Sequence, residues 1–217
     1  MLAITEPTLP PAEVGAWVEA MADAGVDAVQ VRLHDRTDHE LWRAGRAAVA
    51  ASAGRLRVSI NGRADLAIAV GADGVHLPSA GVAPERLAHQ WPELVLGLST
   101  HDADEVSAVR ALAAAGRLDY VTFGPFAASP SKAAYGLPPG PAGLRRAAAH
   151  GVPVLALGGI DPSRVDAARE AGAVGVAAIR ACRDADAARR LVDAVRLAFP
   201  AGAPAHVSAI TARPEPA

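Results

Sequence analysis

The chain has 217 residues, of which 51% are hydrophobic, 4% aromatic and 20% charged, and 21 basic against 23 acidic residues leave a formal net charge of −2. These fractions describe a globular protein with a sizeable core, and they exclude a disordered or fibrous chain. A net charge so near zero provides no overall field that would attract nucleic acid or an anionic membrane. The one cysteine, Cys182, excludes an internal disulfide and a cysteine-built zinc site.

The first residues of the chain lack the basic and apolar regions of a signal peptide. No apolar stretch approaches the roughly 18 residues that a membrane-spanning helix requires. We therefore expect a cytoplasmic protein without a membrane partner.

Short runs rich in Val, Ile and Leu alternate with Ala-rich helical stretches, and this alternation repeats eight times along the chain. Runs without polar alternation are typical of parallel strands that are covered on both faces. The predicted strands are 2–5, 28–33, 57–60, 74–77, 95–99, 120–124, 152–157 and 174–179. The predicted helices are 11–24, 38–53, 63–71, 83–90, 102–115, 141–149, 162–172 and 184–198.

Eight such units predict a single α/β domain, a (β/α)8 TIM barrel over residues 1–199, followed by a mobile tail over 200–217. The competing architecture is a doubly wound open sheet, which is favoured by a glycine-rich first turn. Here the first turn reads Thr5-Glu6-Pro7 and carries no glycine. Helix signals include Asp102 with Glu105 as a capping box, and a glycine such as Gly71 at several helix ends.

In a barrel of this kind the functional residues gather at the carboxyl ends of the strands. The polar or flexible residues at these ends are Gln30, Arg32, His34, Asn61, Arg63, His76, Ser99, His101, Lys132, Gly158, Gly159, Ile179 and Arg180. The pair Gly158-Gly159, with the turn at Ile179 and Arg180, predicts a phosphate site because glycine lets backbone N–H groups approach phosphate oxygens. The alternative is that Gly158-Gly159 only forms a tight turn.

Six phrases of the sequence carry a resemblance to a known family. They are VQVRLHD (29–35), INGRADLAIAVGADGVHL (60–77), GLSTH (97–101), DYVTFGPFAASPSK (119–132), PVLALGGI (153–160) and AGAVGVAAI (171–179). Their ordered set resembles the thiamine-phosphate synthase/TenI superfamily from about residue 2 to 198. In that superfamily the synthase joins a hydroxymethylpyrimidine diphosphate to a thiazole phosphate, whereas the TenI branch aromatises a carboxythiazole phosphate tautomer.

The resemblance implies a set of site residues. The substrate-binding residues that it implies are Gln30, Arg32, Asn61, His76, Ser99 and Lys132. It also implies His101 as the catalytic histidine of the TenI branch, and histidine titrates near neutral pH as a general acid or base needs. Each position has a simpler interpretation: His76 as a core residue, Asn61 as part of an Asn-Gly turn, Lys132 and His101 as solvated side chains.

Three departures from the synthase pattern favour the TenI branch. His34 stands where the synthases carry lysine, and Gly62 and the segment 78–81, Pro-Ser-Ala-Gly, stand where they carry two aspartates that bind magnesium. Asp65 and Asp73 lie nearby in sequence but are placed wrongly in the expected barrel. A divalent cation neutralises the charge that develops on departing diphosphate, so losing both ligands counts against the synthase reaction.

From these observations we expect a TenI-like thiazole tautomerase, an isomerase that uses His101 and needs no cofactor. One alternative is a thiamine-phosphate synthase, a transferase that would need Mg²⁺. The second is a regulatory protein that binds thiazole phosphate or thiamine phosphate without catalysis. A thiazole phosphate is the expected small-molecule partner, a homo-oligomer is allowed, and no nucleic-acid motif is present.

Overall fold

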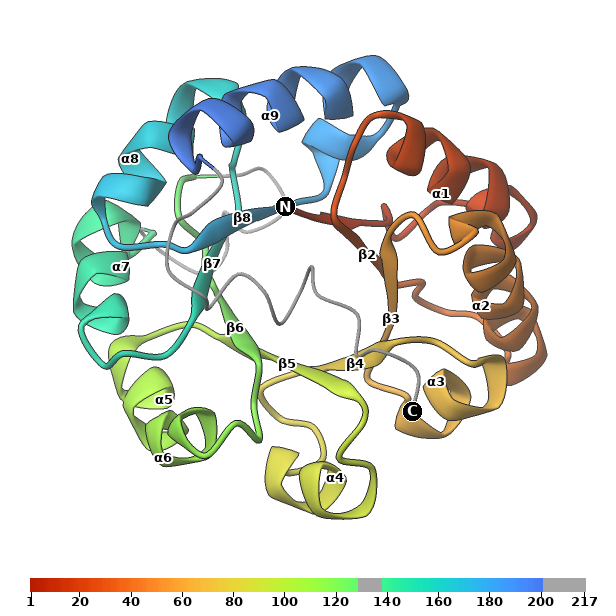
Figure 1. Ribbon diagram of the computed structural model, residues 1–217, viewed down its shortest axis with the longest axis horizontal. Coiled ribbons are helices and arrows are strands. Elements are labelled where there is room, and N and C mark those ends of the chain that lie inside the picture. Colours follow the sequence, from red (N-terminus) through yellow and green to blue (C-terminus); the bar gives the residue numbers. More distant parts are fainter. Residues whose placement is uncertain (129–137, 201–217) are drawn as a thin grey trace.

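The computed structural model describes residues 1–128 and 138–200. Eight parallel strands close into a barrel in chain order, and the helices form a ring around them (Figure 1). The strands are β1 (Leu2–Ile4), β2 (Ala28–Val31), β3 (Arg57–Asn61), β4 (Gly74–Leu77), β5 (Val95–Thr100), β6 (Tyr120–Phe123), β7 (Val154–Leu157) and β8 (Gly175–Ala178). The predicted (β/α)8 barrel is therefore confirmed.

The helices of the described residues follow the predicted stretches closely. They are α1 (Val14–Asp23), α2 (Asp38–Ser52), α3 (Ala64–Val70), α4 (Pro84–Gln90), α5 (Ala103–Ala108), α6 (Arg110–Ala114), α7 (Gly140–Ala148), α8 (Val165–Glu170) and α9 (Ala185–Ala198), with 3-10 turns η1 (Pro11–Glu13), η3 (Pro162–Arg164) and η4 (Arg180–Cys182). The stretch expected as one helix over 102–115 is divided at Val109, whose backbone leaves the helical region at φ −101°, ψ 4°. Within the described ranges no helix has the length and apolar character to cross a membrane.

Local sequence signals explain several helix ends. Gly71 ends α3 with a φ of +72°, a left-handed conformation that glycine adopts without steric cost. The side chain of Asp102 accepts a hydrogen bond from the Glu105 N–H at 2.8 Å, as predicted for a helix cap. The return bond differs, because the Glu105 carboxylate accepts from the N–H of His101 and not from that of Asp102. Half of the predicted capping box is thus formed.

Side chains along each strand alternate between the barrel interior and the layer beneath the helices. The interior apolar cluster comprises Leu2, Ile4, Ala28, Tyr120, Leu155 and Ala177. The larger core lies between the barrel and the helices and includes Val29, Val75, Val121, Val154 and Val176 from alternate strand positions. Every second side chain of a strand shares the same face. Gln30 and Arg32, two and four positions after the interior residue Ala28, therefore continue on the interior side toward the carboxyl end of β2.

The register aligns the predicted site residues across neighbouring strands. Asn61 of β3 pairs with His76 of β4, and Ser99 of β5 pairs with Thr122 of β6. Lys132, and residues 201–217 of the tail predicted to be mobile, lie outside the described residues.

Candidate functional site

The amide of Gln30 is a buried polar group near the carboxyl end of β2. Its side chain is 1% exposed, and its Nε2 donates a hydrogen bond to Oδ1 of Asn61 at 2.8 Å. The other oxygen, Gln30 Oε1, is buried and has no hydrogen-bond partner among the described residues. A buried acceptor without a partner is costly, so this atom is suited to a ligand that brings a hydrogen-bond donor. The Gln30–Asn61 pair that sequence predicted as substrate-binding is thus brought together.

Arg32 provides a cation at the same end of the barrel. The hydroxyl of Thr5 donates to the Arg32 carbonyl at 2.9 Å and accepts from the Arg32 N–H at 2.8 Å, which fixes the backbone where β2 ends. The side chain is half-buried, and burial lowers the pKa of Arg32 because a charge loses hydration there. Arginine remains charged at neutral pH even so, and its planar group suits phosphate oxygens.

His76 lies in the interior as the centre of a polar cluster. Its Nε2 is 3.0 Å from Oγ of Ser99 and 3.4 Å from Oγ1 of Thr122, and its Nδ1 is 3.1 Å from the Tyr120 hydroxyl. The side chain is 2% exposed. Burial, and to a lesser degree the charge of Arg32, lowers the pKa of His76 to about 3. The imidazole is therefore neutral at pH 7 and is occupied by protein partners.

Ser99 differs from His76 because it is only partly buried. The Ser99 hydroxyl contacts Nε2 of the His76 ring. Ser99 lies on β5, where it pairs with Thr122 of β6. A serine fixed on one side and partly open on the other has the arrangement that substrate contact requires. Its role as a substrate-binding residue stays a prediction.

His101 follows β5 but lies on the exposed side of the strand end. Its side chain is 48% exposed, and its Nδ1 is 3.4 Å from Oε2 of Glu105 on α5. The same carboxylate oxygen accepts from the His101 N–H at 2.6 Å. The structure thus joins His101 to the start of α5, and its catalytic role stays a prediction.

The predicted phosphate turn has an unusual backbone. Gly158 and Gly159 have φ values of +95° and +67°, so both positions favour glycine. The Gly158 carbonyl accepts from the Ala127 N–H at 2.9 Å, and the Gly159 carbonyl accepts from Arg164 Nη1 at 2.7 Å. Because a trans peptide directs its N–H opposite to its C=O, the N–H groups of Gly159 and Ile160 point away from these partners. This arrangement suits an anion.

The same glycines are also required by packing. A Cβ at Gly159 would lie 2.9 Å from the Ala127 carbonyl oxygen, and one at Gly158 would lie 2.9 Å from Cα of Pro125. A bulky substitution at either position would therefore move the loop after β6 as well as obstruct a ligand. The tight-turn and phosphate-site interpretations are compatible, and substitution of these glycines does not separate them.

The remaining predicted residues lie around this end of the barrel. Ile179 is half-buried directly after β8, and its carbonyl accepts from the Cys182 N–H at 2.9 Å, which closes the turn η4. Arg180 at the start of that turn is exposed, as is His34 after β2. Both are therefore free of the core, and their roles stay predictions.

The residues present do not fit the carboxylate site for magnesium that the resemblance implies. Gly62 and Gly81 stand at the two positions, and Asp65 is held by Arg63 through bonds of 2.8 and 2.7 Å. Asp73 precedes β4 at the opposite end of the barrel, where it accepts from the Val58 N–H. In the described part of the chain no three His, Cys, Asp or Glu residues are grouped closely enough to hold a metal ion.

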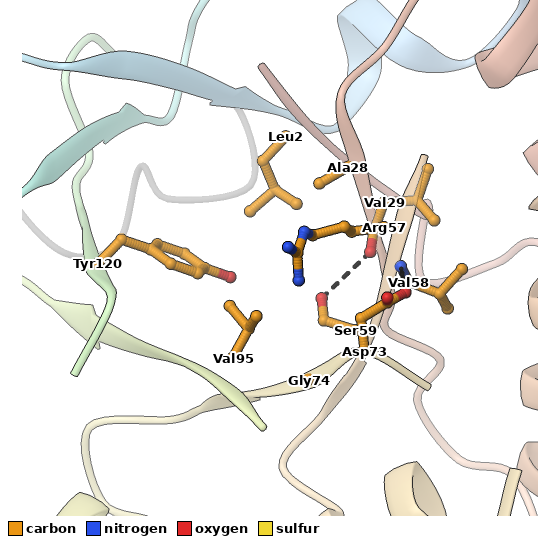
Figure 2. A pocket seen from close by; sticks show the side chains of 10 residues that line it. All are labelled: Leu2, Ala28, Val29, Arg57, Val58, Ser59, Asp73, Gly74, Val95 and Tyr120. Carbon is orange, nitrogen blue, oxygen red and sulfur yellow. Dashed lines mark hydrogen bonds between the residues drawn. The ribbon is translucent and has the colours of Figure 1, made fainter. Parts of the chain in front are cut away.

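A small cavity occupies the opposite end of the barrel (Figure 2). It is lined by the first residues of several strands, and the side chain of Arg57 extends into it between Tyr120 and Ser59. Arg57 is 8% exposed, and its Nε has no partner among the described residues. Burial raises the pKa of nearby Asp119, and the charge of Arg57 opposes that change. Barrel floors contribute to stability, so we place no part of the candidate site there.

The sequence reasoning missed Tyr120 and Thr122, which complete the surroundings of His76. One signal was present in the sequence, namely Gly97 in the middle of β5. Glycine inside a strand often marks close approach of another group. A Cβ at Gly97 would lie 2.5 Å from both His76 Nδ1 and the Tyr120 hydroxyl oxygen, so the glycine makes room for this pair.

Comparisons with known proteins agree on one family. The family model described as thiamine monophosphate synthase matches residues 1–182. A thiamine-phosphate synthase of Anaeromyxobacter dehalogenans is 38% identical over 189 residues, 86% of this chain and 83% of that protein. A putative thiamine-phosphate synthase of Geobacter sulfurreducens is 42% identical over 176 residues, 76% and 78% of the two chains. The solved thiamine phosphate pyrophosphorylase of Pyrococcus furiosus superposes with a TM-score of 0.77 at 26% identity, covering 91% and 96%.

These findings correct the activity expected from sequence. The TenI-like tautomerase, an isomerase, was the wrong choice between the two branches, because these relatives are named as synthases or pyrophosphorylases. The expectation of a tautomerase depended on three departures from the synthase pattern, namely no aspartate at positions 62 and 81 and His34 in place of lysine. The similarity of the rest of the barrel to the synthases outweighs these three differences. The superfamily itself was predicted correctly, and the chain belongs to the thiamine monophosphate synthase family.

Proposed function

We propose that this protein is a thiamine-phosphate synthase, a transferase that joins a hydroxymethylpyrimidine diphosphate to a thiazole phosphate and releases diphosphate. The observation that carries this proposal is the match of the family model to residues 1–182, together with relatives named for this reaction. The synthase was the first alternative from sequence, and its two phosphorylated small molecules are the proposed partners.

The carboxyl end of the barrel supports the proposal with groups for a heteroaromatic ring. Gln30 presents the unpartnered acceptor Oε1, and its hydrogen bond to Asn61 fixes the orientation of both amides. Amide groups read the donor and acceptor edge of a nitrogen heterocycle by paired hydrogen bonds. The Gln30–Asn61 pair would therefore orient the ring of one substrate.

Other groups would bind the phosphorylated parts. Arg32 contributes a half-buried cation, and burial, with no carboxylate partner among the residues described, is what shifts its pKa. The N–H of Gly159 is directed away from the loop after β6 and the N–H of Ile160 is directed away from Arg164, and both are neutral donors that would bind an anion. Fixed donors of this kind stabilise the charge that accumulates on a departing diphosphate without rearranging during the reaction.

The test is an assay of the purified protein with both substrates, with thiamine phosphate and diphosphate measured as products. Arg32→Gln is expected to raise KM for a phosphorylated substrate at least tenfold, about 1.4 kcal/mol. Arg63→Gln is the matched control, because Arg63 is already paired with Asp38 and Asp65, and its KM should change less than about twofold. A folded protein that forms no thiamine phosphate would overturn the proposal.

A further inference from the structure

The segment that joins β2 to α2 carries two arginines, Arg32 and Arg36, at the carboxyl end of the barrel. Both side chains are half-buried. The Nε of Arg36 is buried and has no hydrogen-bond partner among the described residues, and its Nη1 contacts the Asp35 carbonyl at 3.4 Å. A buried donor without an acceptor is costly, so Arg36 is suited to a ligand that brings acceptor oxygens.

The acidic side chain of Glu40, in the first turn of α2, has other partners. Its Oε2 accepts hydrogen bonds from the N–H and the hydroxyl of Thr37, both at 2.9 Å, in a capping box. These bonds are the largest cause of the lowered pKa of Glu40, ahead of the charge of Arg36. Glu40 is therefore engaged in starting α2, and Nε of Arg36 is left without an acceptor.

Arg32 is a second cation of the same segment. It continues the interior side of β2, and its charge is the second cause, after burial, of the lowered pKa of the interior residue His76. Burial lowers the pKa of Arg32 itself, because its charge has lost part of its hydration. A half-buried cation favours an anionic ligand, since the ligand supplies the opposite charge that replaces this hydration.

The proposed reaction requires positive charge at this end of the barrel. The bond between the methylene carbon of the pyrimidine substrate and a diphosphate oxygen breaks, and its electron pair stays on the oxygen. The lone pair of the thiazole nitrogen forms the new carbon–nitrogen bond, so no proton is transferred and the diphosphate gains one negative charge. A divalent cation or a set of fixed cations stabilises this charge.

Two guanidinium groups carry the same formal charge as one Mg²⁺ ion. Proteins usually hold Mg²⁺ by one or two carboxylates together with substrate phosphates. Here Gly62 and Gly81 stand at the two positions where the family pattern has carboxylates, and Asp65 is bound to Arg63. Arginine keeps its charge at neutral pH and matches phosphate oxygens with a planar set of donors. The cations of this segment therefore suit the task that the absent carboxylates would give to a metal.

We propose that Arg32 and Arg36 bind the diphosphate and neutralise its charge in place of a carboxylate-bound magnesium ion. This inference rests on the proposed synthase function for the identity of the anion. It adds Arg36 to the site residues predicted from sequence. It also makes diphosphate binding and turnover independent of a divalent cation.

The first test titrates inorganic diphosphate into the purified protein by calorimetry, once in EDTA and once in Mg²⁺. The wild type should bind diphosphate in EDTA with a Kd at most about threefold weaker than in Mg²⁺, because the arginines supply the charge. Binding that requires Mg²⁺ would overturn the inference. No substrate is converted in this titration, so its result does not depend on whether the protein is a synthase.

Substitutions then locate the site. Arg36→Gln should weaken diphosphate binding in EDTA by about tenfold or more, and Arg36→Lys, which keeps the charge, should recover part of that loss. Arg43→Gln is the matched control, because Arg43 is an exposed arginine of α2, and its Kd should change less than about twofold. With far-UV circular dichroism showing each variant folded, equal binding by Arg36→Gln and Arg43→Gln, or no recovery by Arg36→Lys, would overturn the role of Arg36.

The second test compares initial rates of thiamine phosphate formation in EDTA and in Mg²⁺. Wild-type kcat in EDTA should lie within about tenfold of its value in Mg²⁺, and Arg36→Gln should lower kcat in EDTA by about tenfold or more. Turnover that occurs only in Mg²⁺ would overturn this inference and leave the synthase proposal standing. Diphosphate binding in EDTA without turnover in either condition would overturn the synthase proposal and leave the arginine site standing.

Discussion

Lowering the pH should destabilise this protein through His76 by an amount that follows from its burial. The pKa of the folded ring is about 3, against an ordinary value of 6.5. The unfolded chain therefore binds a proton below about pH 6.5 that the folded chain does not bind, and folding is penalised as the pH falls toward 3. The stability is fully present above pH 6.5 and decreases by about 1.4 kcal/mol for each pH unit below it.

Between pH 7 and pH 5 this linkage amounts to about 1.9 kcal/mol, because the unfolded histidine becomes almost fully protonated over that interval. Other groups also titrate, including Asp27, whose pKa is lowered by the N-terminal ammonium and Arg196 in spite of its burial. The measurement is therefore a difference between proteins. Wild type and His76→Gln share those groups, so subtracting their pH dependences isolates the contribution of His76.

Urea unfolding at about pH 7 and pH 5 should show the wild type losing about 2 kcal/mol more free energy of unfolding than His76→Gln. His89→Gln, at an exposed position near the end of α4, is the matched control and should lose as much as the wild type. A wild-type excess under about 0.5 kcal/mol would refute the reasoning, since His76 would then be as readily protonated in the folded protein as in the unfolded chain.

Three further results are expected. Gly97→Ala should lower the free energy of unfolding by about 1–3 kcal/mol and displace His76, because the added Cβ would clash with His76 and Tyr120. In Gly71→Ala the added Cβ has no atom within 4 Å, so urea unfolding should show a loss of about 1 kcal/mol. His101→Ala should lower turnover less than about tenfold because its ring is exposed and beside Glu105, and a loss of about 10²-fold or more would instead support the catalytic role predicted from sequence. Gly62→Asp should tighten Mn²⁺ binding to the diphosphate-bound protein by about tenfold in a titration, with an unchanged affinity contradicting the assignment of this position.

Most of the fold was predictable because the strands of a parallel barrel are short apolar runs separated by glycine-ended helices. The predicted strand 74–77 coincides with β4, and the run 152–157 differs from β7 only at its start. The division of the helical stretch at Val109 was not predictable, because neither proline nor glycine marks it. Local backbone geometry of this kind depends on packing against the barrel and not on the sequence of the helix alone.

The candidate site was predicted in part. Gln30, Asn61 and Ser99 were found because strand ends in a barrel converge, and the structure joins the first two by a hydrogen bond. The surroundings of His76 include Tyr120, which is distant in sequence and reaches His76 through the pairing of β5 with β6. These contacts join strands that are not neighbours in sequence, and a pattern along one strand does not contain them.

The choice between the two activities turned on a few loop positions, and the barrel explains why these were weak criteria. Gly62 follows Asn61 directly, yet its N–H bonds to the His76 carbonyl at 2.8 Å, so the end of β3 remains fixed without an aspartate. The Gln30–Asn61 pair is therefore independent of the charge lost at position 62. In a fold whose loops vary over a constant scaffold, the proposed synthase would change how leaving-group charge is neutralised before it changed which ring is bound. Under that proposal the two tasks are separable, and the carboxylates absent at positions 62 and 81 concern only charge neutralisation.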